Sequence, residues 1–302
     1  MSQRVDSVFR SVLGFAPKLS ISFIKNGRSL LALVLRLSPL ALAGCGPAHL
    51  QHDVNASERR YLLGADLFQK NMLAPAMEEL TKAVELNTDN ADAHNLLGLV
   101  YLRKAVEGEE LFSRSQCLRG DALSLEKQGA DADFVKAEKE FRAAVKIRPD
   151  FSEAHNNLTV VAQHFGRFDE AISEAESALS NIAYREAFAA EGNLGLAYTS
   201  KGDLVRAAAQ LRKAVFEQPK FCVGHFRLAE VYKQQNELDQ ARSELDLVFA
   251  DKSCPIQEAY HLGGIVWLKL GDRDHSRELF RHCVELAPKS CLARECTLAG
   301  SP

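Results

Sequence analysis

A motif of about 34 residues recurs along this chain, and it limits the fold more than any other feature. One copy reads Asn193-Leu194-Gly195-Leu196-Ala197-Tyr198, then Lys201-Gly202-Asp203, then Ala207, Leu211, Ala214 and Pro219. Another copy opens with Asn95-Leu96-Leu97-Gly98-Leu99-Val100-Tyr101 and ends with Ala137, Phe141, Ala144 and Pro149. The apolar positions 4, 7, 8 and 11 of a copy share one helical face. Each copy therefore predicts two helices that pack through small residues and end at a proline.

This pattern resembles the tetratricopeptide repeat. Six copies fit the chain, at residues 57–90, 91–151, 152–187, 188–221, 222–256 and 257–290. Stacked hairpins of this kind bury one continuous core. We expect an all-α fold, a right-handed superhelix of six helical hairpins over 57–290, with residues 291–302 as a C-terminal cap.

The second copy is longer than the others. Its two halves are separated by an insertion of about 27 residues at roughly 105–131, which is polar and includes Cys117. Leu118, Leu123 and Leu125 favour a short helix or longer hairpin arms. The insertion is either a solvated elaboration or a contact for a partner, because insertions between repeat elements often project from one face.

An apolar stretch near the N-terminus ends in Leu42-Ala43-Gly44-Cys45. Residues 1–44 carry six Lys or Arg residues and one Asp, as a secretory segment does, although the charged region fits a start later than Met1. The ending resembles the lipobox of bacterial lipoproteins; the alternative is a short buried helix. The resemblance implies removal of residues 1–44, a diacylglycerol and an N-acyl chain such as palmitate on Cys45, and a lipid-anchored linker at 45–56.

The composition after the lipobox argues against several classes of function. Residues 45–302 hold 31 basic and 39 acidic residues, a net charge of −8, which does not favour nucleic-acid binding. No phosphate-binding glycine loop, nucleophile elbow or zinc-protease motif occurs. We expect no enzyme, no metal site, no small-molecule substrate and no cofactor beyond the lipid on Cys45. His94, His155 and His225 recur at position 4, where we expect packing residues.

Six cysteines follow Cys45, and export to an oxidising compartment would allow disulfides. Cys222 begins the fifth copy and Cys254 precedes the sixth, so both lie at the same end of adjacent helices. We favour a disulfide between them, with Cys291 as the rival partner of Cys254. Cys283 occupies a position that Ala usually fills, which favours a buried thiol.

A lipobox followed by six such repeats resembles the pilotins of type IV pilus secretins, and among them the motility lipoproteins. The resemblance implies a non-enzymatic protein that binds secretin subunits and promotes assembly of the secretin ring during pilus biogenesis. It also implies an anchor in the outer membrane facing the periplasm, since Gly46 replaces the Asp that retains lipoproteins in the inner membrane. The alternative is a general cell-envelope scaffold for peptidoglycan or outer-membrane protein assembly factors.

In superhelices of this kind, positions 2, 5, 9, 12 and 13 of each first helix face the groove. We therefore expect an apolar strip across the first three copies, rimmed by two asparagines. Its residues are Tyr61, Phe68, Leu99, Leu102 and Val160, with Asn95 and Asn156 at the rim. Such a strip suits an amphipathic helix or an extended apolar segment of a partner. In the alternative interpretation, neighbouring helices cover some of these residues.

Overall fold

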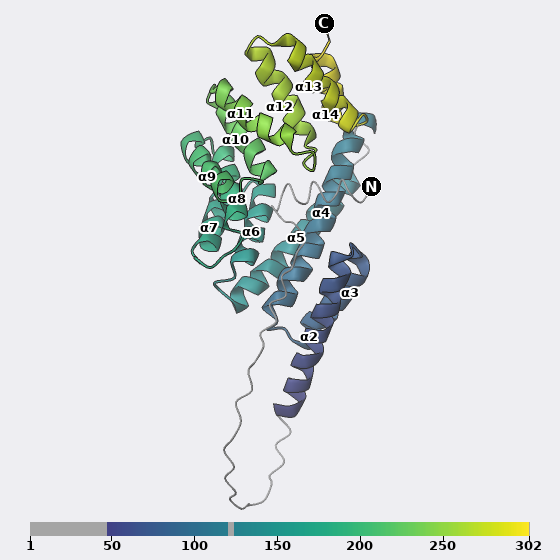
Figure 1. Cartoon of the computed structure of the whole chain (residues 1–302). Coiled ribbons are helices and arrows are strands. Elements are labelled where there is room, and N and C mark those ends of the chain that lie inside the picture. The colour runs from purple at the N-terminus through teal and green to yellow at the C-terminus, as the bar shows by residue number, and fades with distance from the viewer. Residues whose placement is uncertain (1–46, 120–123, 302) are drawn as a thin grey trace, which may run out of the picture.

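The computed structural model describes residues 47–119 and 124–301, and the side chains of 53–109 and 127–301. The described residues form helices and turns, without a strand. Six hairpins and a final helix follow one another along a curved stack (Figure 1). The helices are α2 (Pro47–Gln69), α3 (Leu73–Leu86), α4 (Ala91–Arg119), α5 (Ser124–Ile147), α6 (Ser152–His164), α7 (Phe168–Leu179), α8 (Ala187–Ser200), α9 (Leu204–Glu217), α10 (Cys222–Gln234), α11 (Leu238–Ala250), α12 (Gln257–Lys269), α13 (Arg273–Leu286) and α14 (Cys291–Ala299).

The helices pack as a regular array. The first helix of each hairpin packs on the second, and both contact the first helix of the next hairpin. The even-numbered helices α2 to α14 thus form one layer, called the inner layer below, and the odd-numbered helices α3 to α13 form the other, called the outer layer. The predicted all-α stack of six hairpins is confirmed, and α14 follows the last hairpin.

Small residues allow the two helices of a hairpin to approach closely. A Cβ atom added at Gly98 would lie 2.6 Å from the ring of Phe141, and one added at Gly195 would lie 2.6 Å from Leu211. Gly64 meets Leu80 and Gly264 meets Phe280 in the same way. The repeated Leu-Gly pair of the sequence is therefore a packing requirement, in which the second helix fills the space that the glycine leaves.

In five of the six hairpins the turn between the two helices contains one residue in the left-handed region; the turn of the second hairpin lies outside the described residues. Gly166, Gly202 and Gly271 have φ of 69°, 78° and 91°, and Asn71 and Asn236 have φ of 61° and 62°. In each case the next N–H bonds to a carbonyl five residues earlier, as in Arg167 N to Ala162 O at 2.8 Å. This bond closes the end of the first helix and sets the direction of the second.

Two expectations about boundaries need correction or refinement. Residues 45–56 were expected to be a linker, but α2 begins at Pro47, because a proline at the first helical position costs no hydrogen bond and its φ already suits the helix. The insertion of the second hairpin lengthens both arms, to 29 residues in α4 and 24 in α5. The extended α4 reaches α14, so the second hairpin contacts the C-terminal cap (Figure 1).

Candidate protein-binding surface

Most of the predicted apolar strip lies in the core. Leu99, Leu102 and Val160 are buried in a hydrophobic cluster to which the first three hairpins contribute, and Leu102 has no exposed surface. Tyr61 and Phe68 are partly buried against the same cluster. The prediction of an open strip through Leu99, Leu102 and Val160 is therefore wrong. The reason is that α4 lies between α2 and α6 in the inner layer and packs on α3 and α5 as well, so its sides are covered.

Asn95 and Asn156, predicted at the rim of the groove, are buried and bonded to neighbouring helices. Nδ2 of Asn157 donates to Oδ1 of Asn95 at 3.0 Å, and Nδ2 of Asn193 donates to Oδ1 of Asn156 at 2.9 Å. Arg227 continues the series by donating to Oδ1 of Asn193 at 3.0 Å. These amides join α4, α6, α8 and α10 and hold the inner helices in register. They are not a free rim.

Carboxylates lie along the inner layer, several of them at positions expected to face the groove, although the predicted apolar strip did not include them. Glu58, Asp92, Glu153 and Glu258 occupy position 2 of their copies. Glu186 lies near Glu153, and Glu230 lies near Glu258. All six are exposed or half-buried. Burial, together with the charge of Glu153, raises the pKa of Glu186 to about 7. Burial also raises the pKa of Glu230 to about 7, although Arg227 opposes the shift.

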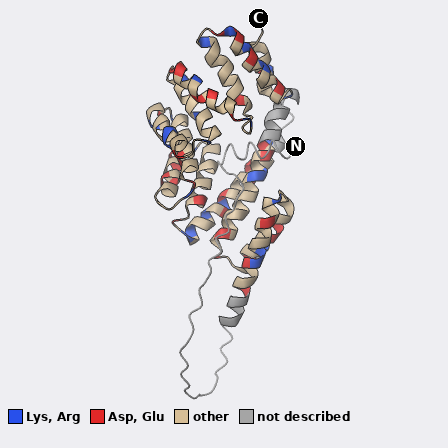
Figure 2. Ribbon diagram, in the orientation of Figure 1, with Lys and Arg blue, Asp and Glu red and all other residues tan. Residues whose placement is uncertain are grey.

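The acidic row lies among ion pairs, and one of its members, Asp92, pairs with Arg148 at 2.7 Å. Figure 2 shows Lys and Arg residues interspersed with Asp and Glu residues along the described helices. Most carboxylates outside the row have a cationic neighbour, as Glu191 has in Lys213. Position 2 recurs in four copies with an acidic side chain, and that periodicity was the signal by which the sequence could have revealed the row.

The lengthened arms of the second hairpin are docked on the third hairpin. His164 of α6 stacks on Phe134 of α5, with ring centroids 3.6 Å apart. Its Nε2 lies 3.0 Å from Asp131, and its Nδ1 lies 3.6 Å from Glu109. These contacts fix the described base of the arms against α6. Cys117, in the insertion, has a side chain outside the described part of the chain.

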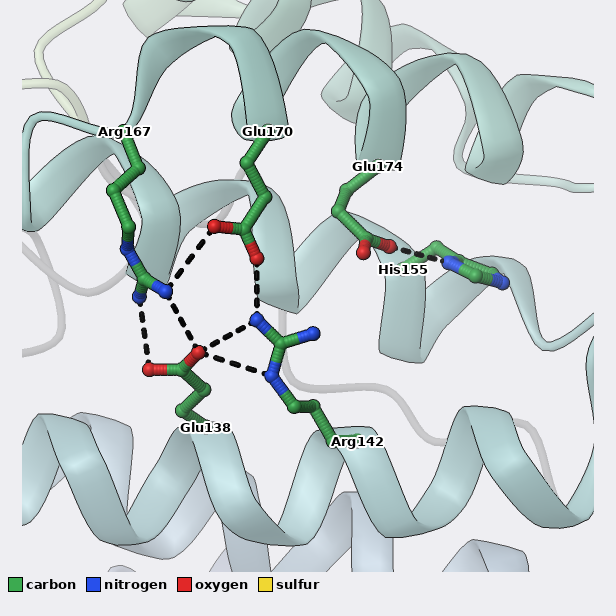
Figure 3. Close-up of polar contacts among 6 residues, drawn as sticks. All are labelled: Glu138, Arg142, His155, Arg167, Glu170 and Glu174. Atoms are coloured by element: carbon green, nitrogen blue, oxygen red, sulfur yellow. Dashed lines mark hydrogen bonds and ion pairs between the residues drawn. The ribbon is translucent and has the colours of Figure 1, made fainter.

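A group of four charged side chains connects the second and third hairpins on the outer layer (Figure 3). Arg167 forms two bonds with Glu138, at 2.9 and 2.8 Å, and Arg142 bonds to both Glu138 and Glu170. The hydrogen bond from Arg167 lowers the pKa of Glu138, and burial opposes it. The two positive and two negative charges balance, which favours a structural role for this group.

The recurrent histidines make the same contacts in three hairpins. Nδ1 lies 2.7 Å from Glu140 in His94, 2.6 Å from Glu174 in His155 (Figure 3) and 2.6 Å from Glu244 in His225. Nε2 meets a backbone carbonyl six residues earlier, at Thr88, Pro149 and Pro219. These histidines are packing residues that also form polar contacts. Each of them joins the two helices of its hairpin to the preceding turn.

The predicted cysteine pair is joined in the structure. Cys222 and Cys254 form a disulfide, with Cα atoms 6.3 Å apart. The expectation of a buried thiol at Cys283 is wrong, because Cys283 forms a second disulfide with Cys296 of α14. The sequence did not predict this bond, because the two residues meet only when the C-terminal cap packs on α13. Cys291 is also in a disulfide, so it does not compete for Cys254.

The remaining sequence predictions concern the lipobox and the absence of a metal site. Leu42, Ala43, Gly44 and Cys45 lie outside the described residues. Within the described ranges, no group of three or more His, Cys, Asp or Glu side chains could hold a metal ion. No described helix has the length and apolar character that a membrane span requires.

Models of one repeat family match three segments of the chain. The matches are a TPR repeat at residues 64–104 and tetratricopeptide repeats at 128–185 and 258–290. The chain contains tetratricopeptide repeats. Families of these repeats are generally non-enzymatic scaffolds, and the six hairpins described above carry the repeat signature through the whole stack.

Two solved structures share this fold over nearly their full length. The crystal structure of PilW, a widely conserved type IV pilus biogenesis factor, superposes with a TM-score of 0.62 at 19% identity, covering 80% of this chain and 98% of PilW. The structure of pilF from Pseudomonas aeruginosa gives 0.61 at 20% identity, covering 82% and 99%. At this identity the likeness establishes the fold. A search of curated proteins by sequence found no match.

Proposed function

We propose that this protein is a non-enzymatic outer-membrane lipoprotein that binds secretin subunits and promotes their assembly into the ring through which a type IV pilus passes. In this proposal Cys45 carries the diacylglycerol and the N-acyl chain, and the tetratricopeptide repeats bind the partner from the periplasmic side. The proposal assigns it to the pilotins, with the motility lipoprotein Tgl as a protein of the same kind.

The observation that carries the proposal is a combination of two features. A lipobox-like segment ends at Cys45, and α2 begins at Pro47 only two residues later. The stack that follows has the fold of PilW over 98% of that chain. A protein named as a pilus biogenesis factor thus shares the fold of this stack.

The mechanism follows from anchoring. Two or more acyl chains hold a protein stably at a membrane, whereas one chain is marginal. An anchored repeat domain meets its partner at a high effective concentration in the layer where secretin subunits must insert. Because the anchor site lies so close to α2, the first hairpin stays near the membrane, and the later hairpins extend from it.

Binding can be tested with the purified domain. Residues 47–301, immobilised on a resin, are expected to retain secretin monomers from a detergent extract of the host bacterium. The resin carrying a second domain unfolded by substitution of Leu102 with Asp serves as the control, because that side chain has no exposed surface. Retention of peptidoglycan enzymes or β-barrel assembly factors in place of secretin would contradict the proposal and favour a general envelope scaffold.

Assembly is tested separately in cells. Deletion of this protein is expected to remove secretin multimers from a denaturing gel while the level of secretin monomer stays the same. Normal multimers in the deletion strain would show that the protein is not an assembly factor for the secretin.

A further inference from the structure

Cys291 is the first residue of the C-terminal cap, and its sulfur is in a disulfide. Four other cysteines are joined to each other, in the pairs Cys222–Cys254 and Cys283–Cys296. Because a sulfur atom takes part in one disulfide only, none of these four is the partner of Cys291. The partner is therefore among the cysteines of the sequence that these two bonds do not use.

Two cysteines of the sequence remain, Cys45 and Cys117. Cys45 comes two residues before the start of α2, which packs on α3 and α4. In the proposed function its sulfur carries the diacylglycerol, so it has no thiol to oxidise. Cys117 belongs to α4, two residues before that helix ends at Arg119. The neighbours of α4 therefore decide whether Cys117 can pair with Cys291.

The helix that contains Cys117 is a neighbour of the helix that Cys291 begins. Cα atoms of α4 and α14 come within 8 Å of each other, and Figure 1 shows α14 beside the far end of the second hairpin. A disulfide forms when two Cα atoms lie roughly 4.4–6.8 Å apart. The base of the arm is held against α6, where Glu109 faces His164. The part of α4 that is left to meet the cap is its last turns, and these contain Cys117.

We propose that Cys117 of α4 is the disulfide partner of Cys291. The bond joins the tip of the second hairpin to the cap, so that α4 to α14 form a covalent loop and the first hairpin stays outside it. Its formation removes one hydrogen atom from each thiol. A disulfide donor of the oxidising envelope takes up the two electrons and two protons and becomes a dithiol.

The covalent loop fixes the curvature of the inner layer. In a repeat stack each hairpin mainly contacts its neighbours, so small rotations between hairpins add up and the stack can open or close. The cap counteracts this because α14 holds two disulfide cysteines, Cys296 bonded to α13 and Cys291 bonded to α4 in the proposal. An inner layer of fixed curvature is pre-organised, and a partner that binds to it orders less of the protein.

Peptide mapping of the full-length protein identifies the partner of Cys291 directly. The protein is extracted from cells with iodoacetamide present and is digested with trypsin without reduction. Trypsin leaves Cys291 as the one cysteine of peptide 290–294, and Cys117 as the one cysteine of peptide 115–119. We expect these two peptides in a single disulfide-linked species, which dithiothreitol separates.

Other results of the mapping would overturn the pairing. They are alkylation of Cys117 by iodoacetamide, or a link between peptide 290–294 and a peptide that holds any other cysteine. A link to peptide 45–59 would also refute the lipid on Cys45. An unmodified Cys45 thiol together with the expected link would refute the lipid alone and leave the pairing intact.

Matched variants test the covalent loop. Cys117→Ser with Cys291→Ser removes the proposed bond, and Cys222→Ser with Cys254→Ser is the control because its bond spans a single hairpin. On a denaturing gel without reductant, we expect the first variant to migrate more slowly than the wild type and the control to shift less. The reason is that a crosslink over nearly the whole stack makes the denatured chain more compact. Equal mobility of the first variant and the wild type would overturn the pairing.

Small-angle X-ray scattering of the same proteins tests the curvature. We expect a larger radius of gyration for Cys117→Ser with Cys291→Ser than for the wild type, and an unchanged radius for the control. Circular dichroism checks that both variants are folded. An unchanged radius in the first variant would overturn the role of the bond in fixing the curvature.

Discussion

Three histidines show how single side chains hold this repeat stack together. In His94, His155 and His225 one ring nitrogen faces a carboxylate and the other faces a carbonyl. A neutral imidazole has only one N–H, so both contacts can be hydrogen bonds only when the ring is protonated. The hydrogen bond to Glu174 raises the pKa of His155 despite burial. Burial lowers the pKa of His225, but the bond to Glu244 outweighs it, and the net pKa is raised.

This arrangement predicts a stability that depends on pH. Because the pKa of His155 is raised on folding, its stabilisation is complete below the unfolded pKa of about 6.5 and is lost as the pH rises through the folded pKa. Glu174→Gln should lower the free energy of unfolding by about 1–3 kcal/mol at pH 6, and by less at pH 9. Glu85→Gln, at an exposed position of α3, is the control. Urea unfolding at both pH values measures this, and an equal loss at both would refute it.

Two glycines in helices differ in the space around them. Gly98 packs against Phe141, where an added Cβ would lie 2.6 Å from the ring, whereas nothing lies within 4 Å of a Cβ added at Gly129. Gly98→Ala should destabilise the domain by about 1–3 kcal/mol through overpacking. Gly129→Ala should stabilise it by up to about 1 kcal/mol through helix propensity. Thermal unfolding of both variants tests the contrast; the same sign of change for both would show that helix packing is not the constraint at Gly98.

At the scale of the helical hairpin, sequence reasoning succeeded where the 34-residue spacing applied. The small residues, the prolines and the apolar positions located every hairpin because each of them serves a contact within one repeat or with its neighbour. Asn71 and Asn236 fill turns in which other copies have glycine, which is expected because asparagine tolerates the left-handed region better than most residues. The residues within each repeat were therefore sufficient to predict these features.

The groove was harder to predict for a physical reason. Assigning groove positions assumes hairpins of standard length, but α4 is 29 residues long and packs against neighbours on several sides. Leu99, Leu102 and Val160 are consequently buried, and Asn156 bonds to Asn193. Glu186 was missed because it lies in a connection and not on a repeat position.

The disulfide between Cys222 and Cys254 joins the starts of two hairpins. Its sequence separation of 32 residues corresponds to about 3–4 kcal/mol of loop-closure entropy removed from the unfolded chain. Replacing both cysteines with Ala should therefore lower the free energy of unfolding by about that amount in non-reducing buffer. Guanidinium unfolding measures the difference, which should shrink in dithiothreitol. A difference that persists undiminished under reduction would mean that packing of the sulfur atoms, and not the crosslink, is responsible.

Across the whole molecule, the second hairpin contacts the C-terminal cap. The extended α4 and α14 are in contact although nearly the whole repeat stack separates them in sequence (Figure 1). Sequence spacing could not reveal this, because the contact depends on the accumulated curvature of the intervening hairpins. The second disulfide, between Cys283 and Cys296, fixes the cap to the last hairpin. The stack is thus tied at its C-terminal end and, in the proposed function, anchored at the other.

The most direct test of a membrane-anchored assembly factor separates the anchor from the repeats. Residues 46–302 are exported behind a signal peptide of a non-lipoprotein, and full-length protein is labelled with radioactive palmitate in parallel. We expect palmitate on the full-length protein and its loss in Cys45→Ala. With the soluble form, secretin monomers should persist at their normal level while multimers fall by about tenfold or more, because the effective concentration at the membrane is lost. Wild-type amounts of secretin multimer with the soluble form, or no palmitate on the full-length protein, would contradict it.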